Sequence, residues 1–175
     1  MTVRQPPLPG VSSRSRRALL AGRPQPEPCR PPWVPAGALA AACTGCGACI
    51  ASCPERILLL DPQGRPKVDF ALGACTFCGA CAAACPEPVF DRRSEPPWSL
   101  IAGVGAGCLA AAGIVCEVCR DNCPSAAIRF RPTLGRVATP LIERDACTGC
   151  GACVAPCPTA AITIAATPIL AEHAG

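Results

Sequence analysis

The residues in this sequence best able to do chemistry are its cysteines. One group has the spacing C-x2-C-x2-C-x3-C and is followed directly by a proline: Cys43, Cys46, Cys49, Cys53 and Pro54. This is the bacterial spacing for thiolates that hold a [4Fe–4S] cluster, and its fourth cysteine usually binds the other cluster of a two-cluster protein. A cubane cluster needs one thiolate at each of its four irons, so one such motif predicts a partner motif elsewhere.

Partner motifs are present further along the chain. Two groups repeat the spacing and the proline: Cys75, Cys78, Cys81, Cys85 with Pro86, and Cys147, Cys150, Cys153, Cys157 with Pro158. A variant, in which the first gap has grown from two residues to seven, consists of Cys108, Cys116, Cys119, Cys123 and Pro124. These four quartets contain sixteen of the seventeen cysteines, and Cys29 is left as a spare thiol.

Two other uses of cysteine fit the pattern less well. In a short secreted chain, this many cysteines would suggest disulfides, but the repeated spacing is that of metal ligands. Structural zinc sites also use C-x2-C pairs, yet zinc would leave the third cysteine and the proline of each quartet without a role. The sequence therefore predicts [4Fe–4S] clusters.

If each half of the chain folds as a two-cluster unit, ligation crosses between its two quartets. Four sites follow, which we call A (Cys43, Cys46, Cys49, Cys85), B (Cys75, Cys78, Cys81, Cys53), C (Cys147, Cys150, Cys153, Cys123) and D (Cys108, Cys116, Cys119, Cys157). Site D stays open, because Cys108 is either a ligand or a bystander that leaves a three-ligand cluster. The sequence thus predicts three or four clusters.

The segments between the quartets indicate which elements hold them. Residues 57–60 and 68–70 flank the turn residues 61–64 and predict a β-hairpin. A short closing strand is expected to begin at Val89 and Phe90. The second half repeats the first hairpin over residues 127–142. Trp33 and Trp98 each precede the first cysteine of their half by ten residues.

This repetition predicts an α+β fold of two tandem bacterial ferredoxin-like modules, in which short helices and two-stranded hairpins surround the clusters. The expected parts are a basic, proline-rich leader over 1–32, modules over 33–95 and 96–166, and a tail over 167–175. The tail contains His173, the single histidine.

The net charge of +4 belongs to the leader. Residues 1–32 carry six arginines against Glu27, whereas the remainder has ten basic and eleven acidic side chains. The total therefore does not indicate nucleic-acid binding. With nine prolines in residues 1–35, the leader is expected to be disordered.

Residues 15–20, Ser-Arg-Arg-Ala-Leu-Leu, look like the core of a twin-arginine export signal. A charged, proline-rich stretch follows where such a signal needs an apolar segment. We therefore expect a protein that stays in the cytoplasm.

Residues 99–116 form an uncharged run of eighteen, a length that raises the question of a membrane span. The run contains four glycines, five alanines and the candidate ligands Cys108 and Cys116, so we predict a buried strand and an enlarged cluster loop instead. The sequence shows no Cys/His pair for nucleophilic catalysis and no phosphate-binding glycine loop. We therefore expect no enzyme activity.

Several features together resemble the NapF-type ferredoxins, accessory proteins of periplasmic nitrate reductase systems. They are Ser15-Arg16-Arg17 with Leu20, Gly22 and Arg23, the stretch Arg30-Pro31-Pro32-Trp33, the order of the quartets, and Phe130-Arg131-Pro132-Thr133-Leu134. The resemblance implies a cytoplasmic protein that interacts with the precursor of the nitrate reductase catalytic subunit and supports its maturation before export, by cluster insertion or by supplying electrons. A redox donor protein would be a further partner. An electron-transfer ferredoxin or an electron-transfer subunit of a redox complex remains the alternative.

Overall fold

The computed structural model describes residues 28–93 and 96–166. The predictions for residues 1–27, including the twin-arginine core, and for the tail with His173 lie outside the described residues. The helices are short: α2 (Ala38–Ala42), α3 (Ala48–Ala51), α4 (Ala80–Ala84) and α5 (Val118–Asp121). The strands are β1 (Leu58–Leu60), β2 (Pro66–Val68), β3 (Leu100–Val104), β4 (Ile128–Thr133), β5 (Arg136–Ile142) and β6 (Ile162–Ala166).

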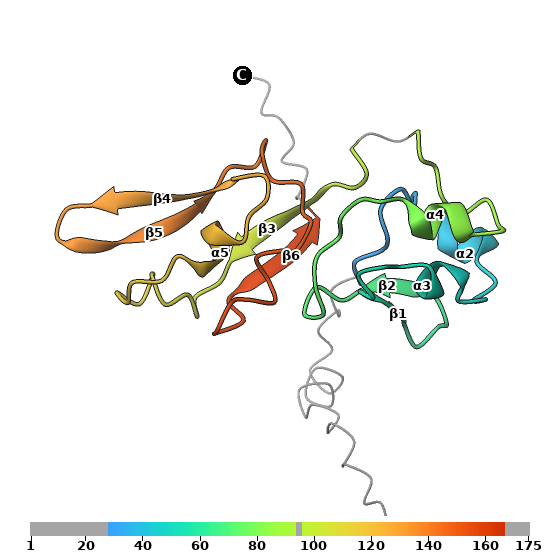
Figure 1. Ribbon diagram of the computed structural model, residues 1–175, viewed down its shortest axis with the longest axis horizontal. Coiled ribbons are helices and arrows are strands. Elements are labelled where there is room, and N and C mark those ends of the chain that lie inside the picture. Colours follow the sequence, from blue (N-terminus) through green and yellow to red (C-terminus); the bar gives the residue numbers. More distant parts are fainter. Residues whose placement is uncertain (1–27, 94–95, 167–175) are drawn as a thin grey trace, which may run out of the picture.

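The strands pair into three antiparallel two-stranded sheets, β1–β2, β3–β6 and β4–β5. Both predicted hairpins are confirmed, with Leu58 opposite Val68 in the first and Ile128 opposite Ile142 in the second. In Figure 1, α2, α3, α4 and the first hairpin gather at one end, the second hairpin extends at the other, and β3 and β6 lie between them. The predicted α+β fold of two tandem modules is therefore confirmed, while the exact module boundaries stay a prediction.

The uncharged run forms β3 at its start, as predicted, although Ala102 is the one buried residue of this strand. Its partner β6 comes from the end of the second module, so the strand closes that module. None of the helices in the described part of the chain has the length and apolar character that a membrane crossing requires.

The strand expected at Val89 and Phe90 was wrong. After the other three quartets, the third residue beyond the last cysteine has a positive φ: Arg56 at 54°, Ala126 at 52° and Ala160 at 50°. That turn leads into the buried residue that starts the following extended segment. At the matching position the second quartet has Pro88, whose ring fixes φ near −65°. The chain therefore turns differently, and Val89 donates a backbone hydrogen bond to the carbonyl of Glu87 at 2.8 Å.

Residues 28–32, assigned above to the leader, pack against the first module. The N–H of Val68 donates to the carbonyl of Cys29 at 2.7 Å, and Pro31 is fully buried. The guanidinium of Arg30 lies 2.7 Å from the carboxylate of Asp61, the one buried charged residue among those described. Because a buried carboxylate needs a partner, this contact holds the start of the described chain against the turn between β1 and β2.

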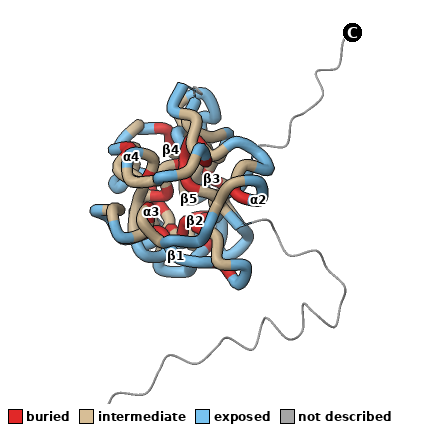
Figure 2. The backbone as a smooth tube through the Cα atoms, turned by 90° about the vertical axis from the view of Figure 1, so that its right-hand side faces the viewer, coloured by how far each residue is buried: buried red, intermediate tan, exposed pale blue. Residues whose placement is uncertain are grey.

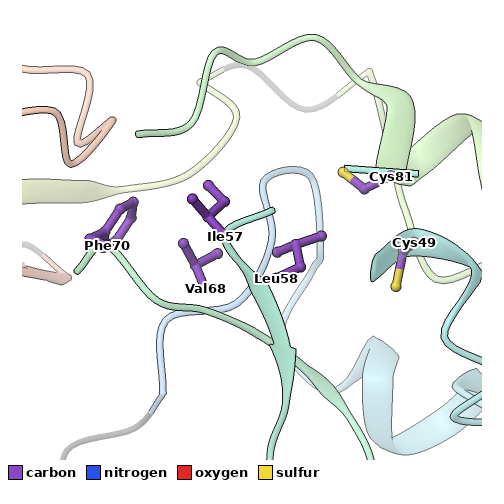
Figure 3. Packing of buried hydrophobic residues seen from close by; sticks show 6 residues of the cluster. All are labelled: Cys49, Ile57, Leu58, Val68, Phe70 and Cys81. Atoms are coloured by element: carbon purple, nitrogen blue, oxygen red, sulfur yellow. The ribbon is translucent and has the colours of Figure 1, made fainter. Parts of the chain in front are cut away.

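Two small apolar cores support the sites. The first consists of Cys49, Ile57, Leu58, Val68, Phe70 and Cys81; Figure 3 shows its two cysteines on one side and Phe70 on the other. The second consists of Ala102, Cys119, Ile128, Cys153 and Ile162. In Figure 2 the buried residues lie inside a shell of exposed loops. Since candidate ligands belong to both cores, loading the sites with metal and packing the cores are coupled.

Candidate iron–sulfur sites

A short helix lies at three of the quartets, and each of these helices contains the third cysteine of its quartet. Helices α3 and α4 follow Gly47 and Gly79, whose φ values of 77° and 76° lie in the left-handed region, where glycine carries no Cβ penalty. In the variant quartet, α5 instead follows Glu117, with φ at −128°. The buried third cysteines of these helices are Cys49, Cys81 and Cys119.

Three pockets are each lined by one predicted set of four cysteines. One is lined by the cysteines of site A (Cys43, Cys46, Cys49, Cys85), one by those of site B (Cys53, Cys75, Cys78, Cys81) and one by those of site C (Cys123, Cys147, Cys150, Cys153). In each, three cysteines come from one quartet and the fourth from the other quartet of the same half. The structure therefore brings together the residues that crossed ligation requires, and the ligand roles themselves stay a prediction.

Within residues 28–93 and 96–166, no three His, Cys, Asp or Glu side chains converge closely enough to hold a metal ion between them. A cubane cluster makes a different demand, because its four thiolates stand around a group of several atoms. Cysteines that line a common pocket fit that donor set.

The electrostatics of the pockets oppose free thiolates. Burial raises the pKa of Cys153 to about 12, and the neighbouring Cys150, Cys147 and Cys123 add to this rise. Burial likewise raises the pKa values of Cys75 and Cys81 to about 11, with other cysteines adding to the shift. Without a metal these thiols stay protonated at neutral pH. Binding iron must therefore displace protons, as is usual for thiolate ligands.

Backbone N–H groups approach several of the sulfurs. Phe77 donates to Cys75 Sγ at 3.4 Å, Ala102 to Cys147 Sγ at 3.5 Å and Ala161 to Cys157 Sγ at 3.3 Å. Hydrogen bonds to cluster-ligating sulfur are one means by which a protein sets the reduction potential. These contacts are therefore suited to tuning sites B, C and D.

The cysteines of site D lie near one another in part. Burial raises the pKa of Cys119, and the nearby Cys108 and Cys116 add to this rise. Cys108 therefore lies close to the rest of its quartet despite the enlarged loop. Cys157 packs against the core that contains Cys119. Although burial alone would raise the pKa of Cys157, hydrogen bonds from Ala161 and Thr159 hold it below its ordinary value. Cys108 lies near Cys119, and its role as a ligand or a bystander stays a prediction.

Cys29 lies outside every pocket lined by the predicted ligands. It is half-buried, its thiol donates to the carbonyl of Ile164 at 3.6 Å, and burial raises its pKa. Its role as a spare thiol stays a prediction.

Phe77 was missed at the sequence level. The first and fourth quartets begin Cys-Thr-Gly-Cys, with Gly45 at φ 72° and Gly149 at φ 67°, whereas the second has Phe77 at the same place with φ 54°. A bulky residue in the left-handed region is an outlier. The signal available in the sequence was the replacement of this glycine by phenylalanine in a quartet of otherwise regular spacing.

Four-cysteine pockets in two successive modules define a class of protein, the tandem [4Fe–4S] dicluster ferredoxins. The family model described as a 4Fe-4S dicluster domain matches this chain twice, over residues 42–89 and 114–161. One match lies in each half. The chain therefore is a ferredoxin-type protein that binds [4Fe–4S] clusters.

Curated relatives narrow the family. The ferredoxin-type protein NapF of Haemophilus influenzae is 50% identical over 136 residues, which cover 77% of this chain and 77% of that protein. Ferredoxin-type protein NapF of Escherichia coli K12 is 43% identical over 152 residues, covering 85% of this chain and 93% of that protein. The chain belongs to the NapF family of ferredoxin-type proteins. A more distant relative, a subunit of the ion-translocating oxidoreductase complex of Methanosarcina acetivorans, is 39% identical over 127 residues, or 70% of this chain and 46% of that protein.

Proposed function

We propose that this protein is a cytoplasmic iron–sulfur accessory factor that binds the precursor of the periplasmic nitrate reductase catalytic subunit and supports its maturation before export. The observation that carries the proposal is the 50% identity to a NapF protein over three quarters of both chains. In this role the protein either inserts clusters into the precursor or supplies the precursor with electrons.

The proposal includes all four sites. At sites A, B and C the four cysteines of each set line one common pocket. Cys108 and Cys116 both add to the raised pKa of Cys119. We therefore propose four [4Fe–4S] clusters in place of three. Iron and acid-labile sulfide in anaerobically purified protein test the number: about sixteen irons per chain support four clusters, and about twelve support three.

Binding of the precursor is tested with a leader truncation that leaves the fold intact. Because residues 28–32 pack on the first module, the truncation removes residues 1–27 and stops before Pro28. A matched control removes residues 167–175, the other end outside the described fold. Iron content shows that both variants are loaded.

If the basic leader docks the protein, the variant without residues 1–27 fails to pull down the precursor, whereas the variant without residues 167–175 succeeds. A second assay measures nitrate reductase activity in cells that carry each variant. If the variant without residues 1–27 binds and activates the precursor fully, the leader does not dock the protein. Failure of the full-length protein to bind the precursor at all would overturn the maturation proposal.

The alternative is an electron carrier or an electron-transfer subunit, and the relative whose name describes a component of an oxidoreductase complex favours it. The assay is the reduction of mature nitrate reductase by the prereduced protein. Rapid electron delivery to the mature enzyme, together with no binding of the precursor, would favour the alternative. The reverse pattern would favour maturation.

A further inference from the structure

The two modules touch at the candidate ligands themselves. The backbone N–H of Cys75, in site B, donates to the carbonyl oxygen of Cys150, in site C, at 2.8 Å. This hydrogen bond joins a ligand loop of the first module to a ligand loop of the second. Sites B and C are therefore neighbours, although Cys75 and Cys150 are far apart in the sequence.

Trp98 contacts both of these loops. Its ring packs edge-on against Phe77, with centroids 5.2 Å apart, and Phe77 lies between Cys75 and Cys78 of site B. Its indole N–H donates to the carbonyl of Thr148 at 2.8 Å, and Thr148 lies between Cys147 and Cys150 of site C. One side chain thus binds the ligand loops of two sites in different modules.

The backbone of Phe77 supports a positioning role for this contact. Its φ of 54° stands where the first and fourth quartets have glycine, and such a conformation persists only where the surroundings hold it. The Phe77 ring packs edge-on against Trp33 as well as Trp98, with centroids 6.5 Å and 5.2 Å apart. The ring is therefore held by two aromatic neighbours at the boundary of the modules.

One glycine of the fourth quartet allows the close approach. A Cβ on Gly151 would overlap the ring of Phe70, which belongs to the first module. Phe70 in turn packs edge-on against Trp98 at 5.9 Å between centroids. The boundary is thus closely packed where Gly151 meets Phe70, which is unlike the loose contact expected of two independent modules.

We propose that Trp98 is a positioning residue that clamps the ligand loop of site B to that of site C, so that the two modules form one continuous electron path. In the step between them one electron leaves the reduced cluster at one site and enters the oxidised cluster at the other. No bond forms or breaks and no proton moves. A one-electron donor reduces the clusters at one end of this path, and a one-electron acceptor oxidises them at the other. The inference rests on the ligand sets proposed above and not on the identity of the partner.

The test isolates the pair of sites within the full chain. Replacing Cys43, Cys46, Cys108 and Cys116 with alanine removes two ligands each from sites A and D, so that about eight irons remain in sites B and C. Trp98→Ala and Trp98→Phe are then made in this background. Phe130→Leu is the matched control, because it also removes an aromatic ring, but one that packs against the core of the second module.

The readout is paramagnetic resonance of the anaerobic, dithionite-reduced protein, in which two neighbouring reduced clusters broaden each other's signals. With Trp98 intact and with Phe130→Leu we expect the broadened signal. With Trp98→Ala we expect an unchanged iron content and the narrow signal of isolated clusters. Trp98→Phe keeps an aromatic ring but loses the hydrogen bond to Thr148, so we expect partial narrowing.

Two results would overturn the inference. If both Trp98 variants show the same broadening as the protein with Trp98 intact, Trp98 does not position the pair. If Trp98→Ala fails to load iron, the signal of Trp98→Phe alone decides. Narrow signals with eight irons and Trp98 intact would show that sites B and C are not coupled. An iron content well below eight with Trp98 intact would instead overturn the ligand sets, and so separates their failure from that of the clamp.

Discussion

Replacing Gly151 by alanine is expected to destabilise the protein much more than the same change at Gly47. The two glycines hold matching places in the fourth and first quartets, directly after the second cysteine, and their φ values are 81° and 77°. A Cβ on Gly47 would meet no atom within 4 Å, whereas a Cβ on Gly151 would overlap the Phe70 ring. The pair therefore separates backbone strain from the contact between the modules.

The magnitudes follow from these two terms. Placing alanine in the left-handed conformation costs roughly 1–2 kcal/mol at either site. At Gly151 the buried Phe70 must also move, and overpacking a well-packed core costs about 1–3 kcal/mol more. For a chain of this size, 1 kcal/mol lowers the melting temperature by roughly 2–4 °C. We therefore expect a drop of about 2–8 °C for Gly47→Ala and a further drop of roughly 2–12 °C for Gly151→Ala.

The assay is thermal unfolding of the anaerobic, cluster-loaded protein, followed by far-ultraviolet circular dichroism and by visible absorbance of the clusters. Unfolding that releases clusters is irreversible, so both variants are compared with the parent at one scan rate. Equal melting temperatures for Gly47→Ala and Gly151→Ala would refute the reasoning, since they would show that the modules do not meet at Phe70.

Three further outcomes are expected. Asp61→Asn removes the partner of Arg30 and should cost about 1–3 kcal/mol. Burial alone would raise the pKa of Asp61, but the N–H of Arg65 and the Arg30 guanidinium hold it below its ordinary value. This contribution is complete above the unfolded pKa of about 3.9 and lost only as the pH falls through the lower folded value. The melting difference between parent and variant should therefore be equal at pH 6 and pH 8; a difference that changes over this range would contradict the assignment. Cys108→Ala should lower the iron content from about sixteen to between about twelve and fifteen per chain, and an unchanged content would make Cys108 a bystander. Cys29→Ser should leave the iron content unchanged, because Cys29 lies outside the four sets, and loss of a cluster would assign it a ligand role.

Local spacing was sufficient to predict which cysteines line a common pocket at sites A, B and C. A thiolate at every third residue, with small residues between, constrains the chain to wrap one group, and the fourth cysteine of such a motif usually serves the neighbouring cluster. The structure places Cys85 with the first quartet and Cys53 with the second, in the two pockets of the first half. Both hairpins were predictable for a similar reason, because their turn residues lie between short apolar runs.

The segment at residues 88–90 and the packing of residues 28–32 each depended on a single residue whose effect the sequence pattern did not indicate. Pro88 ended the expected closing strand, since its fixed φ excludes the turn used by Arg56, Ala126 and Ala160. Residues 28–32 were assigned to the leader by composition, whereas the buried carboxylate of Asp61 binds Arg30 and holds them against the module. Composition averages over a segment and so does not register one such contact.

The sequence by itself determined the cofactor class, the grouping of cysteines at sites A, B and C and the repetition of one module, because each follows from residue types at short, fixed separations. Only the tertiary structure decided how the two modules meet. The contact between Cys75 and Cys150 and the packing of Trp98 on Phe77 join residues distant in the chain. Such contacts depend on the shape and close packing of two folded surfaces, which no local spacing encodes.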